Sequence, residues 1–340
     1  MDNKVEAQKV SLIKNLFSFF KISQSKRENA EKPKDVRTWI IHGISELIGT
    51  ILLSLLLAGL STTVGQLNNK AVVIEEYLLH PIIVGFYAGF IAVGLVLFIF
   101  LRFSCDLNPS VSLFRYLNGT NNGWYTSYKI SIQFLGGFIA GLIIYGVGSS
   151  TAPEGFLYNQ PITTIGAAKK AFHLFQGSSS VSTMSTAGTF WILFVELVMT
   201  AVLLFPIFSP NINNKYRDLF IMFIISMSVW MGILGGSAAI NPARGFAQQV
   251  STLFIQNLDT ANISVNSLVA ANGMTIAQQK DAVMNSVISA TITMILADLL
   301  APVFYIFIQG LTKYVVNPFV VKVIAYKNYK SQNMEKPSSK

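Results

Sequence analysis

The sequence is short of charge, cysteine and histidine. Asp, Glu, Lys and Arg make up 12% of its 340 residues, about half of the ~25% that is usual in soluble domains. Cys105 is the single cysteine, so we expect neither an internal disulfide nor a cysteine-based metal site. His42, His80 and His173 are scattered, and no nucleophile stands at a meaningful spacing from a base. The sequence therefore predicts no metal, no cofactor and no enzymatic activity.

The sequence is rich in long apolar stretches. Hydrophobic residues make up 52% of the chain, and six runs approach the ~17–25 residues that a helix needs to cross a bilayer. We expect membrane helices at Trp39–Leu60, Ile82–Leu101, Tyr128–Val147, Phe190–Phe208, Leu219–Ile233 and Val287–Ile308. The first run follows a basic arm and has full membrane length, so we do not expect it to be a cleaved signal peptide.

The net charge of +9 is unevenly distributed along the chain. Most Lys and Arg residues fall in the N-terminal arm, in the C-terminal tail and in the two loops on the same side of the six runs. Such an excess marks the cytoplasmic side of a membrane protein. The distribution predicts a multi-pass protein of the plasma membrane with both termini in the cytoplasm, and it argues against a nucleic-acid partner.

Two short motifs follow the second and fifth apolar runs, Asn108-Pro109-Ser110 and Asn241-Pro242-Ala243. Asn is a strong helix N-cap, and Pro is preferred at the first helical position. Each motif therefore predicts the start of a helix. The apolar stretch after the second motif has only ~10 residues, too few to span a bilayer at ~1.5 Å per residue. We expect two half-helices that begin inside the membrane.

A second repeated pattern accompanies these motifs. Glu46 and Thr50 lie in the first run, and Glu196 and Thr200 lie at the same spacing in the fourth. Together with the Asn-Pro motifs, the pairs resemble the aquaporin and aquaglyceroporin family (major intrinsic proteins) over roughly residues 39–313. The chain looks similar to a bacterial glycerol facilitator. The resemblance implies an all-α membrane protein with six transmembrane helices and two half-helices in an inverted repeat, commonly assembled as a homotetramer.

The expected organisation follows from counting the runs. Each half contains three runs and one half-helix, and because three is odd the halves have opposite orientations in the membrane. The N-terminal arm is either an amphipathic surface helix or a disordered tail. In chain order we expect this cytoplasmic arm (1–38), a first repeat (39–148), an outer loop (149–188), a second repeat (189–312) with a long outer loop (251–280), and a basic cytoplasmic tail (313–340).

The two half-helices are expected to meet N-terminus to N-terminus near the middle of the membrane. Each N-terminus carries roughly half a positive charge, so the pair repels cations, including hydronium. The amides of Asn108 and Asn241 can donate hydrogen bonds to a passing oxygen. Glu46 and Glu196 are expected to brace the loops before the half-helices by accepting N–H groups; the alternative is a protonated Glu packed in the bundle.

The resemblance also indicates a selectivity constriction. It places Arg244 there, where the side chain donates to solutes and repels cations; the alternative is an Arg paired with an outer carboxylate. By position relative to each Asn of the motifs, the resemblance places Ala88, Val229 and Ala238 at the other constriction positions. A one-residue gap in this alignment would place Tyr87 or Trp230 at the constriction instead. Small apolar residues around one Arg imply a wide constriction that suits polyols such as glycerol as well as water.

Three features depart from the family pattern. Ser104-Cys105-Asp106 stands where members often have Gly-Ala-His, and Gly245 follows Arg244 where glycerol-conducting members often have Asp. Asp298 lies in the sixth run, where small residues are usual, and is either an interior carboxylate or part of a subunit seam. Ser110 replaces the usual Ala, and we expect little change from it.

The sequence therefore predicts a passive channel for small neutral solutes, glycerol and water, that excludes ions and protons. Its expected partners are these solutes and the lipid bilayer. A water-selective aquaporin is the alternative within the family. Outside it, a secondary transporter shares broken helices and inverted repeats and would require an ion gradient. A non-conducting membrane scaffold would need bulky constriction residues, which Ala88 and Ala238 do not supply.

Overall fold

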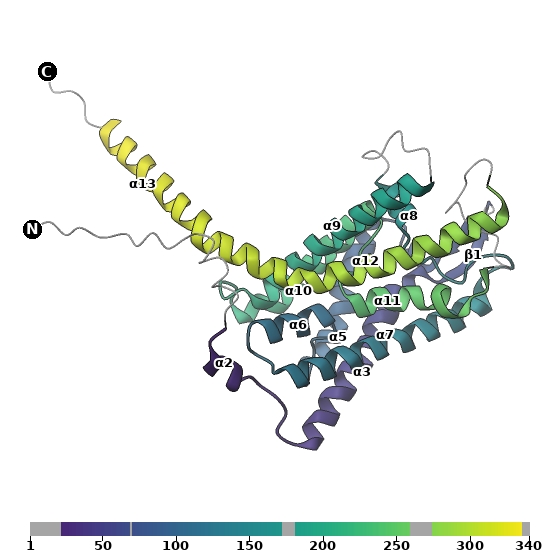
Figure 1. Cartoon of the computed structure of the whole chain (residues 1–340), viewed down its shortest axis with the longest axis horizontal. Coiled ribbons are helices and arrows are strands. Elements are labelled where there is room, and N and C mark those ends of the chain that lie inside the picture. The colour runs from purple at the N-terminus through teal and green to yellow at the C-terminus, as the bar shows by residue number, and fades with distance from the viewer. Residues whose placement is uncertain (1–21, 69, 172–180, 259–273, 335–340) are drawn as a thin grey trace, which may run out of the picture.

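The computed structural model describes residues 22–68, 70–171, 181–258 and 274–334 (Figure 1). The expected surface helix of the N-terminal arm, residues 10–20, lies outside this part of the chain, as does the middle of the expected 251–280 loop. Within the described residues the protein is a bundle of long helices, with the short helix α2 (Gln24–Glu28) before it and α13 (Asn317–Met334) extending away from it.

All six predicted membrane helices are present. Helical segments long and apolar enough to cross a membrane lie at Val36–Ser61, Pro81–Phe100, Gly123–Thr151, Val181–Phe208, Asn214–Ile233 and Ile276–Gln332. They contain, in order, α3 (Val36–Leu57) with a 3₁₀ turn (Ala58–Ser61); α4 (Pro81–Phe86), a π-helical segment (Tyr87–Val93) and α5 (Gly94–Phe100); α7 (Gly123–Thr151); α9 (Val181–Phe208); α10 (Asn214–Gly235); and α12 (Ile276–Leu311), a π-helical segment (Thr312–Val316) and α13.

The two half-helices also begin at the predicted residues. They are α6 (Pro109–Leu117) and α11 (Pro242–Val250), each with nine residues and with Pro in the first turn. A π-helical segment, Ser251–Ile255, extends α11. The Asn108 and Asn241 side chains fix the start of each half-helix as its N-cap.

Several helices are longer than their apolar runs. The fifth begins at Asn214 rather than 219, because the Asn213 side chain caps its N-terminus. The sixth begins at Ile276 rather than 287, where Thr275 and Gln278 form a capping box. The fourth begins at Val181 rather than 190. Hydropathy locates the part of a helix that contacts lipid, whereas caps and backbone hydrogen bonds set its ends.

The loops contain structure that the sequence did not predict. Strands β1 (Thr63–Leu67) and β2 (Lys70–Val73) form an antiparallel hairpin, followed by a 3₁₀ turn (Ile74–Leu78). The short helix α8 (Thr164–Lys170) lies in the expected outer loop. The hairpin lies at the opposite end of the molecule from α2 and α13 (Figure 1). We call these ends the hairpin side and the terminal side.

Glycines let α7 approach the second half-helix closely. A Cβ atom at Gly137 would collide with the carbonyl oxygen of Ala243, and one at Gly141 would lie 2.7 Å from that of Ala247. Small residues allow this kind of close backbone approach between membrane helices. The position of α11 therefore depends on the α7 glycines.

We predict that Gly137→Ala lowers thermal stability, because the added methyl group must displace α11; overpacking typically costs ~1–3 kcal/mol. Gly146→Ala is the matched control, since Gly146 lies in the same helix and a Cβ atom added there would meet no other atom within 4 Å. The measurement is thermal unfolding of the purified protein in detergent. Equal melting temperatures for the two variants would contradict the packing argument.

Candidate functional site

The site is built around the N-termini of α6 and α11. The Asn108 side-chain oxygen accepts from the Ser110 backbone N–H at 2.9 Å. The Asn241 oxygen accepts from the N–H groups of Ala243 at 3.1 Å and Arg244 at 3.3 Å. Each Asn therefore caps its own half-helix through the oxygen, which leaves its amide hydrogens for other partners.

Each amide reaches across to the other loop. Asn108 Nδ2 donates to the Ile240 carbonyl at 2.9 Å, and Asn241 Nδ2 donates to the Leu107 carbonyl at 2.7 Å. These two reciprocal bonds tie the half-helix N-termini to each other. One hydrogen of each amide is used in this way, and the second remains for a solute oxygen.

The residues before the two Asn share an uncommon backbone conformation. Leu107 and Ile240 have φ values of 50° and 57°, in the left-handed region that non-glycine residues seldom adopt. Their N–H groups donate to Glu46 Oε2 and Glu196 Oε2, each at 2.8 Å. The same two residues therefore bond through their N–H to a buried carboxyl group and through their C=O to the opposite Asn.

The two Glu side chains bind their loops in parallel ways. Glu46 Oε1 accepts from Ser104 Oγ at 2.6 Å and from the Asp106 N–H at 3.0 Å. Glu196 Oε1 accepts from Ser237 Oγ and from the Ala239 N–H at 2.9 Å. Both Glu residues are fully buried. Each Glu thus accepts from one hydroxyl and two N–H groups of its loop; that the two residues brace the loops stays a prediction.

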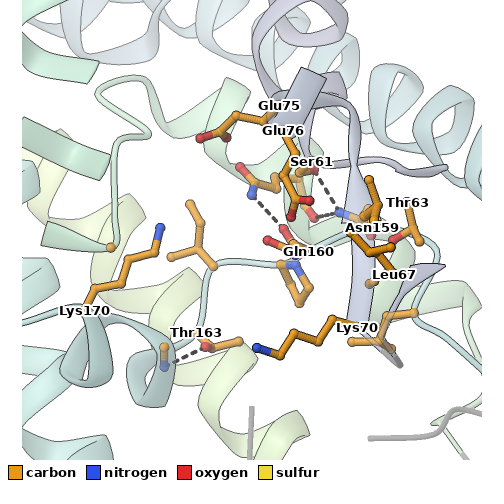
Figure 2. A pocket seen from close by; sticks show the side chains of 18 of the residues that line it. Ser61, Thr63, Leu67, Lys70, Glu75, Glu76, Asn159, Gln160, Thr163 and Lys170 are labelled. Carbon is orange, nitrogen blue, oxygen red and sulfur yellow. Dashed lines mark hydrogen bonds between the residues drawn. The ribbon is translucent and has the colours of Figure 1, made fainter. Parts of the chain in front are cut away.

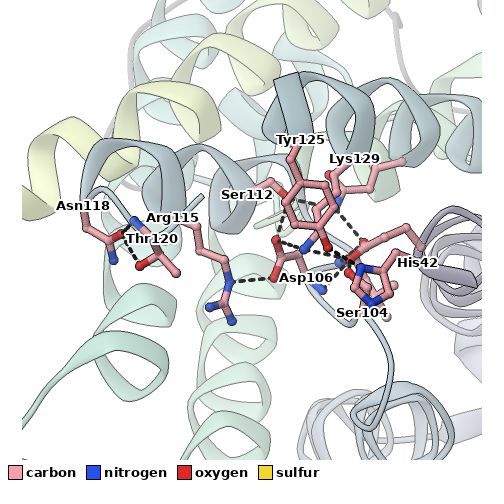
Figure 3. Close-up of polar contacts among 12 residues, drawn as sticks. His42, Ser104, Asp106, Ser112, Arg115, Asn118, Thr120, Tyr125 and Lys129 are labelled. Atoms are coloured by element: carbon pink, nitrogen blue, oxygen red, sulfur yellow. Dashed lines mark hydrogen bonds and ion pairs between the residues drawn. The ribbon is translucent and has the colours of Figure 1, made fainter. Parts of the chain in front are cut away.

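A charge cluster of Asp106, Lys129 and Arg115 lies on the terminal side (Figure 3), and Lys129 links it to Glu46. Lys129 Nζ lies 2.9 Å from Asp106 Oδ2 and 3.5 Å from Glu46 Oε1. Arg115 Nε lies 2.7 Å from Asp106 Oδ1. Gln133 Nε2 donates to Glu46 Oε2 at 2.8 Å. Two cations and two carboxylates at this spacing stabilise one another where a single buried charge would be costly.

A cavity of about 200 Å³ connects the two Asn residues to part of the predicted constriction. Val229 and Ala238 line it, together with Asn108 and Asn241. The rest of its wall is mostly apolar, with Asp106, Arg115, Arg217 and Asp218 among the polar lining residues. The cavity therefore has one polar centre at the Asn pair and an apolar wall elsewhere.

The other two predicted constriction residues do not line this cavity. Ala88 is buried, with 1% of its surface exposed. Arg244 Nη1 donates to the Ala238 carbonyl at 3.3 Å. Among the described residues no carboxylate lies within salt-bridge distance of Arg244, so an Arg paired with an outer carboxylate is not observed.

The one-residue alternative Trp230 is directed elsewhere. Its indole Nε1 donates to the Ile82 carbonyl at 3.2 Å, and a Cβ on Gly85 would overlap the ring. The ring therefore packs in the seam between α4 and α10, and Val229 rather than Trp230 contributes to the cavity. Tyr87, the other alternative, starts the π-helical segment and is half-buried.

A second cavity, of about 500 Å³, lies on the hairpin side (Figure 2). The hairpin, the segment 157–163, α8 and Gln248 near the end of α11 enclose it. Its lining includes Lys70, Glu75, Glu76 and Lys170, so charges of both signs border it. Because α11 runs from Asn241 towards this cavity, the two cavities lie at opposite ends of the second half-helix.

Comparison with known proteins agrees with this architecture. A family model described as major intrinsic protein matches residues 34–259. The chain belongs to the major intrinsic protein family. A comparison with curated proteins gave no match. The crystal structure of the aquaglyceroporin from Plasmodium falciparum superimposes with a TM-score of 0.51 and 18% sequence identity, over 83% of this chain and 98% of that one.

Membership of the family settles several predictions. The predicted fold of six membrane helices and two half-helices is confirmed. This major intrinsic protein is a multi-pass membrane channel for small neutral solutes and not an enzyme.

The sequence analysis missed two features of the site. It gave no role to Lys129, which lies in α7 and is buried at 4% exposure. The signal was its i, i+4 spacing to Gln133, which puts both side chains on one helix face. It also expected little from Ser110, whose hydroxyl donates to the Asp298 carbonyl at 2.8 Å.

We predict that Glu46→Ala impairs the channel far more than Glu46→Gln. Alanine leaves the loop N–H groups and Ser104 without an acceptor, and each unsatisfied buried group costs ~1–3 kcal/mol. Gln retains one acceptor oxygen. Solute flux and melting temperature are measured for both variants, with Glu154→Ala at an exposed position as the control. An alanine variant equal to the control would show that Glu46 is not a brace.

We predict that Cys105 reacts slowly with maleimides and that its modification slows conduction. The thiol lines the cavity on the terminal side. Burial, with the negative charges of Glu46 and Asp106, raises its pKa to about 12. The thiolate fraction at neutral pH is then roughly 1,000-fold below that of an ordinary cysteine. Labelling is followed by mass spectrometry against Cys105→Ser. Rapid labelling, or unchanged flux after complete labelling, would contradict the prediction.

Proposed function

We propose that this channel conducts glycerol and water passively. The observation that supports this most directly is the cavity in which Val229 and Ala238 face Asn108 and Asn241. Two small apolar side chains beside two amide donors accommodate a carbon chain with hydroxyl groups. A water-selective pore would need a narrower and more polar constriction at these positions.

We also propose that the channel excludes ions and protons. The positive ends of α6 and α11 face each other across the reciprocal Asn bonds. A water molecule that accepts from both remaining amide hydrogens directs its own hydrogens away from the centre, which interrupts a chain of proton transfer. Arg244, one turn into α11, adds a full positive charge at the proposed constriction.

The proposal extends to location and assembly. The basic residues of the terminal side, including Arg115 and Arg217, support a plasma-membrane orientation with both termini in the cytoplasm. The resemblance to aquaporins supports a homotetramer with one pore in each subunit. The hairpin-side cavity is then the outer entrance, and the 200 Å³ cavity leads to the inner one.

Stopped-flow light scattering on proteoliposomes tests the solute. Vesicles that contain the wild-type protein are mixed with sucrose, which stays outside, or with glycerol. Vesicles with the Arg244→Ala variant and empty vesicles serve as controls. We expect fast shrinkage in both solutions and fast re-swelling in glycerol alone. Shrinkage without re-swelling would indicate a water-selective pore. A rate equal to that of empty vesicles, with folded protein, would contradict a conducting channel.

A second prediction concerns the width of the pore. Val229→Phe narrows the cavity and is expected to reduce glycerol flux by at least about tenfold, with a smaller effect on water, because a glycerol molecule is wider than water. Met231→Phe is the matched control, since Met231 lies on the same helix and is 50% exposed. Equal effects on glycerol and water would exclude Val229 from the selectivity constriction.

A further inference from the structure

The second brace has a neighbour that the first lacks. Asp298 of α12 is fully buried, as is Glu196. Its Oδ1 atom accepts from Thr200 Oγ1 at 2.6 Å. Its Oδ2 atom has no donor among the described residues. Thr200 lies one turn after Glu196 on α9, so the two side chains share a helix face, and the Thr200–Asp298 bond brings the Asp298 carboxyl group beside Glu196. A buried carboxyl oxygen without a donor, next to a second carboxyl group, points to a proton between them.

Glu46, the first brace, has a side-chain amide donor and a cation beside it that Glu196, the second brace, lacks among the described residues. Glu46 receives a hydrogen bond from the Gln133 amide and has Lys129 3.5 Å away. Within the described part of the chain, neither Glu196 nor Asp298 has a cation at salt-bridge distance. The charge of Arg244 acts on both carboxyl groups from further away, and its guanidinium donates to the Ala238 carbonyl instead. Gln133 supplies an amide donor to Glu46, whereas the side chain beside Glu196 is the carboxyl group of Asp298.

Two ionised carboxylates are not stable together in such a place. Like charges in contact repel, and burial penalises each charge further, so one of the two groups retains a proton. We propose that Asp298 and Glu196 share one proton, and that this hydrogen bond positions the second pore loop. The proton supplies the donor that Gln133 supplies in the first repeat.

The shared proton affects the loop directly. The N–H groups of Ala239 and Ile240 and the hydroxyl of Ser237 all donate to Glu196. Asp298 also accepts from Ser110 of the first half-helix through its backbone carbonyl. Asp298 thus contacts the brace of one loop and the start of the opposite half-helix. It is a positioning residue that does not line either cavity described above.

Infrared spectroscopy of the reconstituted full-length protein detects the proton. We expect the wild type to show a protonated-carboxyl C=O band that resists hydrogen–deuterium exchange. Asp298→Asn removes this band, because the amide donates to an ionised Glu196. Asp281→Asn, at an exposed position of the same helix, retains it. Absence of the band from the wild type, or its persistence in Asp298→Asn, overturns the proposal.

Flux measurements test the positioning role. Asp298→Asn is expected to keep solute flux within about twofold of wild type, because an amide N–H replaces the carboxyl O–H. Asp298→Leu offers no donor and is expected to lower flux about tenfold. Loss of flux in a folded Asp298→Asn variant, or full flux in Asp298→Leu, contradicts the role. If Asp298→Leu does not fold, the Asn variant alone decides. The infrared result does not depend on which solute passes, so it can fail separately from the proposed function.

Discussion

The centre of the structure depends on two reciprocal hydrogen bonds. Asn108 and Asn241 each cap one half-helix and donate to the carbonyl that precedes the other Asn. These carbonyls belong to Leu107 and Ile240, which adopt the left-handed conformation that non-glycine residues seldom adopt. The surrounding structure must therefore stabilise this conformation, and it does so through the N–H groups of the same two residues. The N–H group of Leu107 donates to Glu46, and that of Ile240 donates to Glu196. The pairing of two helix N-termini, which repel each other electrostatically, is thereby fixed by groups from both repeats.

The two repeats solve the same problem with different chemistry. In the first, a cation and an amide accompany the brace carboxylate, and Asp106 joins the same cluster. In the second, the neighbouring group is another carboxyl, Asp298, which Thr200 holds on the same face of α9 as Glu196. Inverted repeats therefore need to share geometry but not residues. The proton that we propose for the second brace follows from this difference.

The parts of the fold that could be predicted are those with local causes. Asn followed by Pro after a membrane-length apolar run predicted the start of each half-helix, and both begin at the predicted residues. The spacing of Lys129 and Gln133 puts both side chains on one helix face, but the ion pair of Lys129 with Asp106 could not be predicted, because only the fold brings these two residues together. The hairpin of β1 and β2 and the early start of α12 were missed because neither belongs to an apolar run. For the pore, Val229 and Ala238 share a cavity with the Asn pair; the selectivity roles of these two residues, like those of Ala88 and Arg244, remain predictions.

The most direct test of this account measures proton and solute flux in the same proteoliposomes. A trapped pH-sensitive dye reports proton entry under an imposed pH gradient, and light scattering reports glycerol entry. The account predicts rapid glycerol entry with a proton leak equal to that of empty vesicles, because the facing helix N-termini and the Asn pair interrupt proton transfer. Glycerol entry accompanied by a channel-dependent proton leak would contradict it.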